Sequence, residues 1–260
     1  MNSLMQLVQG SAHHLPFLAD GSIHAVITSP PYFNLRAYAG EQDIDWPEVV
    51  YAPMAGLPPV TVPAQRCALG GEAEPFAYIG HLILCLREWG RVLRDDGVCL
   101  VNLGDSYAAN RSYQVNGTKQ TRGSQPANGA SVPDGLKPKN LLLIPARFAL
   151  AAQADGWIVR AGIVWAKGVS FLPDYAGSAM PESVTDRPSR THEDIFLLAK
   201  RERYFWDGYA VREKSLLPND NRKARSAEGQ KSLPTEQVNG IRPGSATYAT
   251  RNLRSVFVIN

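Results

Sequence analysis

The chain has 260 residues, 44% of them hydrophobic, with 27 Lys and Arg against 24 Asp and Glu and a formal net charge of +3. These values are typical of one large globular domain, and so weak a positive charge permits a nucleic-acid partner without arguing for one. The sequence contains neither a run of about 20 apolar residues nor an evident signal peptide, so we expect a cytoplasmic protein without a membrane span.

In its first half the sequence predicts a strand, an insertion, a helix and a second strand. The apolar stretch 22–28 is bounded by Asp-Gly and Pro-Pro, which is typical of a short strand. Residues 40–74 are rich in Pro, Gly and acidic side chains and predict a loop or insertion. Apolar residues recur at helical spacing over 75–93, and the continuous apolar run 98–103 is typical of a buried parallel strand.

The second half repeats this alternation between polar loops. We expect a helix over 141–154 and strands over 158–165, 194–199, 204–206 and 253–259. The alternation predicts an α/β fold, with helices on both faces of a sheet. Residues 1–260 then form one domain that carries polar loops or insertions at 40–74, 106–138 and 212–250.

Three cysteines, Cys67, Cys85 and Cys99, show neither CxxC pairing nor a histidine at zinc-ligand spacing. Cys85 and Cys99 lie in apolar surroundings and are expected to be buried thiols, whereas the state of Cys67 is open. The sequence therefore predicts no disulfide framework and no metal ligands.

The run Ile27-Thr28-Ser29-Pro30-Pro31-Tyr32 carries the strongest chemical signal. Two consecutive prolines stiffen the backbone and remove two amide donors, and we expect the carbonyl groups there to stay unpaired. A hydroxyl group precedes the prolines and an aromatic ring follows them. This arrangement suits a flipped nucleobase with an exocyclic amino group, although a rigid turn is the common role of a bare Pro-Pro pair.

An exocyclic amine is a poor nucleophile because its lone pair is delocalised into the ring. Hydrogen-bond acceptors around its two N–H bonds favour the rehybridised form and the developing positive charge. The Ser29 hydroxyl and the Pro30 carbonyl are placed to accept these bonds, and Tyr32 could stack on the base.

The surroundings of this run resemble the amino-group DNA methyltransferases, which act on N4 of cytosine or N6 of adenine, in the permuted order that places the catalytic motif first. Residues 27–32 resemble the Thr-Ser-Pro-Pro-Tyr form of that motif. Further segments resemble family motifs in the family's order: Asn102–Tyr107, Lys137–Leu141 with Ile144–Arg147, Asp155–Trp157 with Ile163–Lys167, Pro181–Val184 with Asp186–Pro188, His192-Glu193 with Phe196–Leu198, and Arg251–Val256.

The resemblance implies a Rossmann-like sheet and transfer of a methyl group from S-adenosylmethionine to the amino nitrogen of a flipped base in double-stranded DNA. It implies N4 of cytosine, because adenine enzymes more often carry Asp where Ser29 stands. The implied catalytic residues are Ser29, Pro30, Pro31 and Tyr32, and the implied donor-binding residues are Ser11 and Thr28. Two alternatives stay open: an N6-adenine enzyme, and a non-catalytic DNA-binding remnant.

The chain departs from the family pattern at two places. It contains no glycine-rich donor loop, and it has Gly10-Ser11 where the family has Gly-Asp. The resemblance thus implies a chain that stops before the donor motif, or an enzyme whose second chain supplies the donor-binding half. A restriction endonuclease is a further implied partner.

Basic and aromatic residues outside the run are candidates for DNA contact. They are Arg36, Tyr38, Lys119, Arg122 and Lys167. Asp105 could touch the substrate or donor, or serve as a turn or helix cap. His192 and Glu193 precede a strand and are expected to fix local structure. Carbon-5 methylation and deamination are excluded, because no cysteine follows a proline and no zinc-ligand set is present.

Overall fold

A computed structural model describes residues 5, 7–34, 42–108, 132–168, 184–214 and 250–258. The chain divides into one unit of Met1–Phe205 with Ser255–Asn260 and a second unit of Trp206–Arg254. In the second unit, β9 (Glu213–Lys214) pairs antiparallel with β10 (Thr250–Arg251). The predicted loops 106–138 and 212–250 lie largely outside the described residues.

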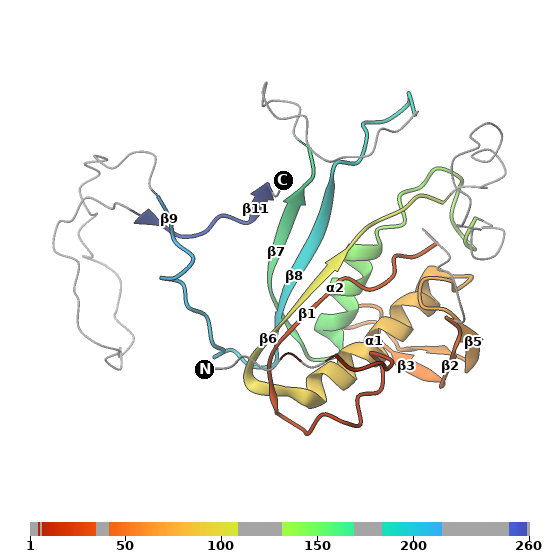
Figure 1. The fold of residues 1–260 in the computed structure, drawn as a ribbon. Coiled ribbons are helices and arrows are strands. Elements are labelled where there is room, and N and C mark those ends of the chain that lie inside the picture. The colour runs from red at the N-terminus through yellow and green to blue at the C-terminus, as the bar shows by residue number, and fades with distance from the viewer. Residues whose placement is uncertain are drawn as a thin grey trace. The chain divides into compact units, whose positions relative to one another are not determined.

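The first unit is built on a five-stranded sheet in the order β1-β6-β8-β7-β11 (Figure 1). These strands span Ile23–Thr28, Leu93–Leu103, His192–Ala199, Ile158–Ala166 and Val256–Val258 in the same order. β1 runs parallel to β6 and β7 parallel to β11, whereas β8 is antiparallel to both β6 and β7. The carboxyl ends of β1, β6 and β7 therefore meet the start of β8 at one edge of the sheet, where α/β proteins commonly bind ligands.

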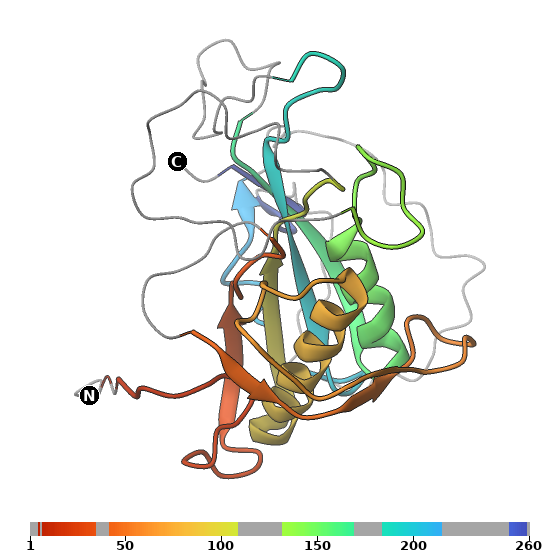
Figure 2. The same cartoon turned by 90° about the vertical axis from the view of Figure 1, so that its right-hand side faces the viewer.

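Two helices pack on one face of this sheet, as Figures 1 and 2 show from two sides. α1 (Pro75–Val92) and α2 (Ile144–Ala154) each begin with a proline in the first turn, where no amide partner is lost. The buried face of α1 includes Leu82, Ile83 and Leu86, each fully buried. The predicted α/β class is confirmed, and within the described residues the helices cover this one face.

The segment 40–74, predicted as a loop or insertion, contains short strands in its described part. It holds two antiparallel pairs, β2 (Ile44–Trp46) with β5 (Gln65–Cys67) and β3 (Val49–Tyr51) with β4 (Val60–Val62). The β3–β4 pair packs on α1 where Gly80 leaves room, since an added Cβ there would lie 2.8 Å from Val62 Cγ2. In β3 and β4, short runs of β-branched residues thus outweigh the surrounding Pro and Gly.

Several predicted boundaries shift. β6 begins at Leu93 directly after α1, so Asp95 and Asp96 belong to the strand and do not follow the helix as a turn. Residues 204–206 form no strand in the described structure, although the Phe205 amide donates to the Asp96 carbonyl at 2.8 Å. α2 begins at Ile144, because Leu143 has a left-handed φ of 58°.

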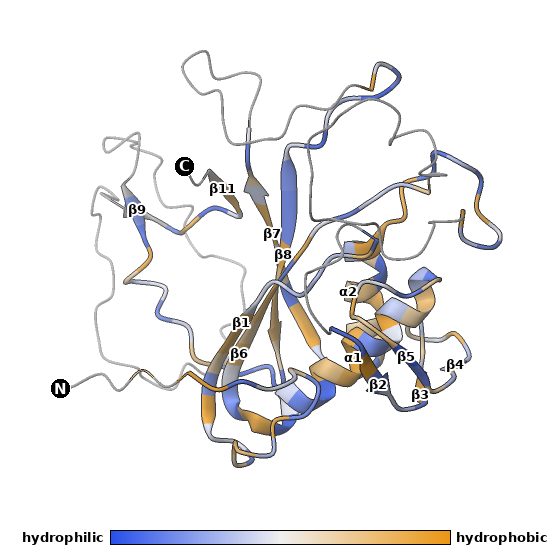
Figure 3. Cartoon of the chain, turned by 45° about the vertical axis from the view of Figure 1, so that its right-hand side comes forward, coloured by the Kyte–Doolittle hydropathy of each residue, from blue (hydrophilic) through white to orange (hydrophobic). Residues whose placement is uncertain are grey.

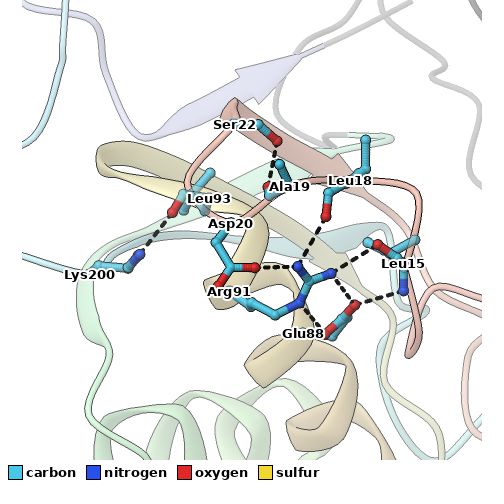
Figure 4. Close-up of polar contacts among 9 residues, drawn as sticks. All are labelled: Leu15, Leu18, Ala19, Asp20, Ser22, Glu88, Arg91, Leu93 and Lys200. Carbon is cyan, nitrogen blue, oxygen red and sulfur yellow. Dashed lines mark hydrogen bonds and ion pairs between the residues drawn. The ribbon is translucent and has the colours of Figure 1, made fainter.

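The guanidinium group of Arg91, in the last turn of α1, fixes the segment that leads into β1 (Figure 4). It donates to the carbonyls of Leu15 and Leu18 at 2.9 and 3.0 Å, and it pairs with Glu88 and Asp20. The amide of Leu15 in turn donates to Glu88 Oε1 at 2.7 Å. We call these contacts of Arg91 and Glu88 the clamp. Because β1 follows the segment that they bind, the clamp holds the first strand against α1.

Hydropathy changes along β8, which is polar at its start and apolar toward its end (Figure 3). The start carries His192, Glu193 and Asp194, and the end carries the buried Leu197 and Leu198. The polar start lies at the edge where the other strands end, so a polar site forms there on a sheet with an apolar centre. No helix among the described residues is long and apolar enough to cross a membrane.

Candidate active site

The segment after β1 is a rigid corner held by side chains from behind. Pro30 and Phe33 are buried, and the Tyr78 hydroxyl of α1 donates to the Pro31 carbonyl at 2.8 Å. The Asn34 amide donates to the Gly70 carbonyl at 2.8 Å. The expectation that both proline carbonyls stay unpaired is therefore wrong for Pro31, because α1 supplies a phenol donor that the sequence did not reveal.

In front of this corner, four side chains form a hydrogen-bonded cluster. The Tyr32 hydroxyl donates to Glu193 Oε2 at 2.7 Å. Asn102 Nδ2 lies 2.7 Å from Tyr32 Oη, 2.7 Å from Glu193 Oε2 and 3.4 Å from Ser29 Oγ. The Ser29 hydroxyl donates to Tyr32 Oη at 3.2 Å. The cluster joins the end of β1, the end of β6 and the start of β8, and we call it the corner cluster.

Lys167 completes the charge balance of the corner cluster. It follows the end of β7, and its ammonium group pairs with Glu193 Oε1 while lying 5.0 Å from the Trp165 ring centroid. Burial favours the neutral acid, but hydrogen bonds from Lys167, Asn102 and Tyr32 outweigh it and hold the pKa of Glu193 below its ordinary value. Glu193 is therefore an ionised acceptor at neutral pH.

One acceptor of the corner cluster is left over. Asn102 is 7% exposed, and its Oδ1 is buried without a hydrogen-bond partner among the described residues. The Pro30 carbonyl likewise receives no hydrogen bond from the part of the chain that is described. A buried acceptor without a donor is costly, and a ligand N–H group would satisfy it.

The ring of Tyr32 lies against the backbone at Gly104, just beyond β6. An added Cβ at Gly104 would lie 2.6 Å from two ring carbons of Tyr32. This close approach requires glycine at position 104, and it fixes the plane of the ring together with the hydroxyl contacts to Asn102 and Glu193.

Asp105 accepts a hydrogen bond from the first amide of α2, although the N-cap residue of that helix is Leu143. Its Oδ1 accepts from the amides of Ser106 at 2.9 Å and of Ile144, the first residue of α2, at 3.0 Å. Arg190 Nη1 lies 3.6 Å from Oδ2. Burial raises the pKa of Asp105 above its ordinary value. The residue fixes the approach of α2 to the end of β6.

Apart from Lys167, the predicted donor-binding and DNA-contact residues either take no part in the corner cluster or lie outside the described residues. Ser11 lies in the N-terminal turn, where its hydroxyl contacts His13 Nδ1 at 2.6 Å, and Thr28 pairs with Val101 in the β1–β6 register. Lys167 joins the corner cluster. The remaining candidates for DNA contact, Arg36, Tyr38, Lys119 and Arg122, lie outside the described residues.

Two members of the corner cluster were not predicted as site residues. Glu193 was expected to fix local structure, and Asn102 was named only as part of a motif. Asn102 is the polar residue of the apolar run 98–103, which is a signal that could have found it, whereas Glu193 stands between His192 and Asp194 and has no such signal. What the sequence alone could not show is that an antiparallel β8 brings position 193 to the end of β1.

Comparison with known proteins gives a family match over most of the chain. A family model described as DNA methylase, N6_N4_Mtase, matches residues 23–249. Type II methyltransferase M.Cfr9I of Citrobacter freundii is 38% identical over 201 residues, which cover 75% of this chain and 54% of that protein. Type II methyltransferase M.XycI of Xanthomonas campestris pv. cyanopsidis is 40% identical over 201 residues, with the same two coverages.

The chain thus spans about half the length of the curated relatives it matches, 54% in both cases. Among solved structures, the PvuII DNA methyltransferase (cytosine-N4-specific) aligns with a TM-score of 0.41 and 14% identity. That alignment covers 75% of this chain and 48% of the other, and so distant a likeness carries no argument about chemistry.

Proposed function

The chain belongs to the DNA methylase family of the N6/N4 type, and we propose that it methylates the exocyclic amino nitrogen of a flipped base in double-stranded DNA. The corner cluster is the observation that carries this proposal. Three acceptors, Ser29 Oγ, the Pro30 carbonyl and Asn102 Oδ1, belong to residues at the ends of β1 and β6. An amino group needs acceptors of this kind.

In the reaction, these oxygen atoms accept hydrogen bonds from the two N–H bonds of the base's amino group, which is the methyl acceptor. Hydrogen bonds to Ser29 and Asn102 favour the tetrahedral form of the nitrogen and stabilise the positive charge that develops on it. Glu193 stays ionised and keeps the Tyr32 hydroxyl oriented. The methylated amine is a strong acid, so its extra proton leaves to solvent without a base of raised pKa.

Methyl transfer of this kind uses S-adenosylmethionine, which supplies an electrophilic methyl group. The predicted donor residues Ser11 and Thr28 do not fit a complete donor site by themselves. The Ser11 hydroxyl is bound to His13, and the described residues contain no glycine-rich turn from a strand into a helix. The donor thus remains a proposal that rests on family membership.

We further propose N4 of cytosine as the target, because Thr28-Ser29 precedes the prolines where adenine enzymes more often have Asp. The curated relatives bear the name type II methyltransferase, which supports a role in restriction and modification in the cytoplasm beside an endonuclease of the same specificity. Arg36, Tyr38, Lys119, Arg122 and Lys167 remain proposed DNA contacts.

Nucleoside analysis tests the proposal. The purified protein is incubated with duplex DNA and isotopically labelled S-adenosylmethionine, and the digested DNA is analysed by mass spectrometry. We expect labelled N4-methyldeoxycytidine. Labelled N6-methyldeoxyadenosine would overturn the cytosine assignment and retain amino methylation. An absence of label, together with no donor binding by calorimetry at millimolar donor, would favour the DNA-binding remnant.

A further inference from the structure

A second cluster of ligating side chains lies behind the rigid corner, outside the corner cluster. One donor atom each of Cys67, Glu72 and His81 lies within 4.8 Å of the other two. They come from β5, from the turn that follows it and from α1. Glu72 and His81 are fully buried, which is rare for an acid and an imidazole unless each has a partner.

The contacts around these residues prepare them for a cation. His81 Nδ1 lies 2.6 Å from Glu72 Oε1, and the indole of Trp46 stacks on the imidazole with ring centroids 4.3 Å apart. The Trp46 indole N–H donates to the Cys67 carbonyl at 3.0 Å and so fixes the residue that carries the thiol. Ligand orientation by such surrounding groups is the rule in protein metal sites.

We propose that Cys67, Glu72 and His81 bind a zinc ion. Thiolate, imidazole and carboxylate are together the ligand types of zinc, and hard ions such as Mg²⁺ avoid sulfur. Tetrahedral zinc bonds of about 2.0–2.3 Å place ligand atoms roughly 3.3–3.8 Å apart. The imidazole and carboxylate, now in direct contact at 2.6 Å, would therefore separate to admit the ion, and the thiolate already lies within 4.8 Å of both. This inference departs from the sequence-based expectation of no metal, because the three residues lack a recognisable spacing along the chain.

The ion would stiffen the support of the rigid corner. Glu72 Oε2 accepts from the Gly70 amide at 2.8 Å, and the Gly70 carbonyl accepts from the Asn34 amide at 2.8 Å. Gly70 itself has a φ of 85°, and an added Cβ there would lie 2.8 Å from the Tyr32 carbonyl oxygen. Zinc on Glu72 thus restrains the turn on which Tyr32 and Asn34 rest.

Cobalt spectroscopy tests the site without reference to methyl transfer. Co²⁺ titrated into the metal-free protein should saturate at one ion per chain with a thiolate-to-cobalt charge-transfer band, and equimolar Zn²⁺ should abolish the band. Cys67→Ser should remove the band and weaken zinc binding at least tenfold. Cys67 is half-buried, so this variant should fold, and Cys85→Ser is the matched control that should retain the band.

Either of two results would overturn the proposal: no charge-transfer band in the parent protein at micromolar Co²⁺, or a band of equal strength in Cys67→Ser. A melting temperature that rises with Zn²⁺ in the parent and in Cys85→Ser, but not in Cys67→Ser, would support it independently.

Discussion

Ser29 is the side chain whose role is simplest to isolate. Its hydroxyl can accept from the amine, while the surrounding backbone is held by prolines that the substitution Ser29→Ala leaves in place. We expect methyl transfer to slow about 10- to 100-fold, with DNA affinity changed less than twofold. Single-turnover kinetics and DNA titration measure the two quantities. Ser22→Ala is the control, because the Ser22 hydroxyl donates to the Ala19 carbonyl in the segment before β1. Equal rates in Ser29→Ala and the parent would refute the role.

Glu193 is expected to be a positioning residue, which orients Tyr32 and Asn102 through hydrogen bonds. Glu193→Gln leaves Lys167 without its counter-charge and weakens the orientation of Tyr32 and Asn102. We expect kcat to fall about tenfold or more while KM for DNA stays within about twofold. A purely structural role would lower the melting temperature and raise KM instead. Glu202→Gln, at an exposed position, is the matched control.

At the scale of elements, the contact between Tyr32 and the end of β6 requires a residue without a side chain. In Gly104→Ala the new methyl group would meet the ring at 2.6 Å, so the ring must move out of the cluster. We expect a destabilisation of about 1–3 kcal/mol and a loss of activity. Gly162→Ala in β7 is the control, since its Cβ would lie 3.8 Å from Phe196. An unchanged melting temperature and full activity of Gly104→Ala would contradict the packing argument.

The clamp of α1 on the segment before β1 should depend on pH. The hydrogen bond from Arg91 is the main cause that lowers the pKa of Glu88 from 4.5 to about 2. A carboxylate with a lowered pKa stabilises the fold above its ordinary pKa, and this contribution disappears as the pH falls from about 4.5 toward 2.

Glu88→Gln should accordingly lower the free energy of unfolding by about 1 kcal/mol at pH 7, the upper range for a partly exposed pair. The difference from the parent protein should shrink as the pH falls below 4.5, the ordinary pKa of the residue. Denaturant titrations at several pH values measure this, with exposed Glu48→Gln as control. A difference that stays constant down to pH 3 would show that the lost charge is not the cause.

At the scale of the whole molecule, the strands of the central sheet were predicted from the sequence, whereas the short strands of the segment 44–67 were not. Apolar runs bounded by turn residues or polar loops marked β1, β6, β7 and β8, because strands that contribute to a packed sheet are rich in apolar residues. The four short strands between 44 and 67 were missed because each spans only three residues. The site was likewise predicted in part. Pro30 and Pro31 indicate the rigid corner from local sequence, whereas Asn102 and Glu193 reach it through the pairing of β6 with β8, which the sequence does not show.

The central claim is that the corner after β1 and the side chains of β6 and β8 hold the amino group of a flipped base. A crystal structure of the protein with duplex DNA that contains its target site tests this most directly. We predict a base outside the helix whose amino nitrogen lies about 3 Å from two of the three acceptors Ser29 Oγ, the Pro30 carbonyl and Asn102 Oδ1, one for each N–H bond. A target base that lies elsewhere, with Asn102 still unpaired and no room for a nucleotide at the corner, would contradict the account.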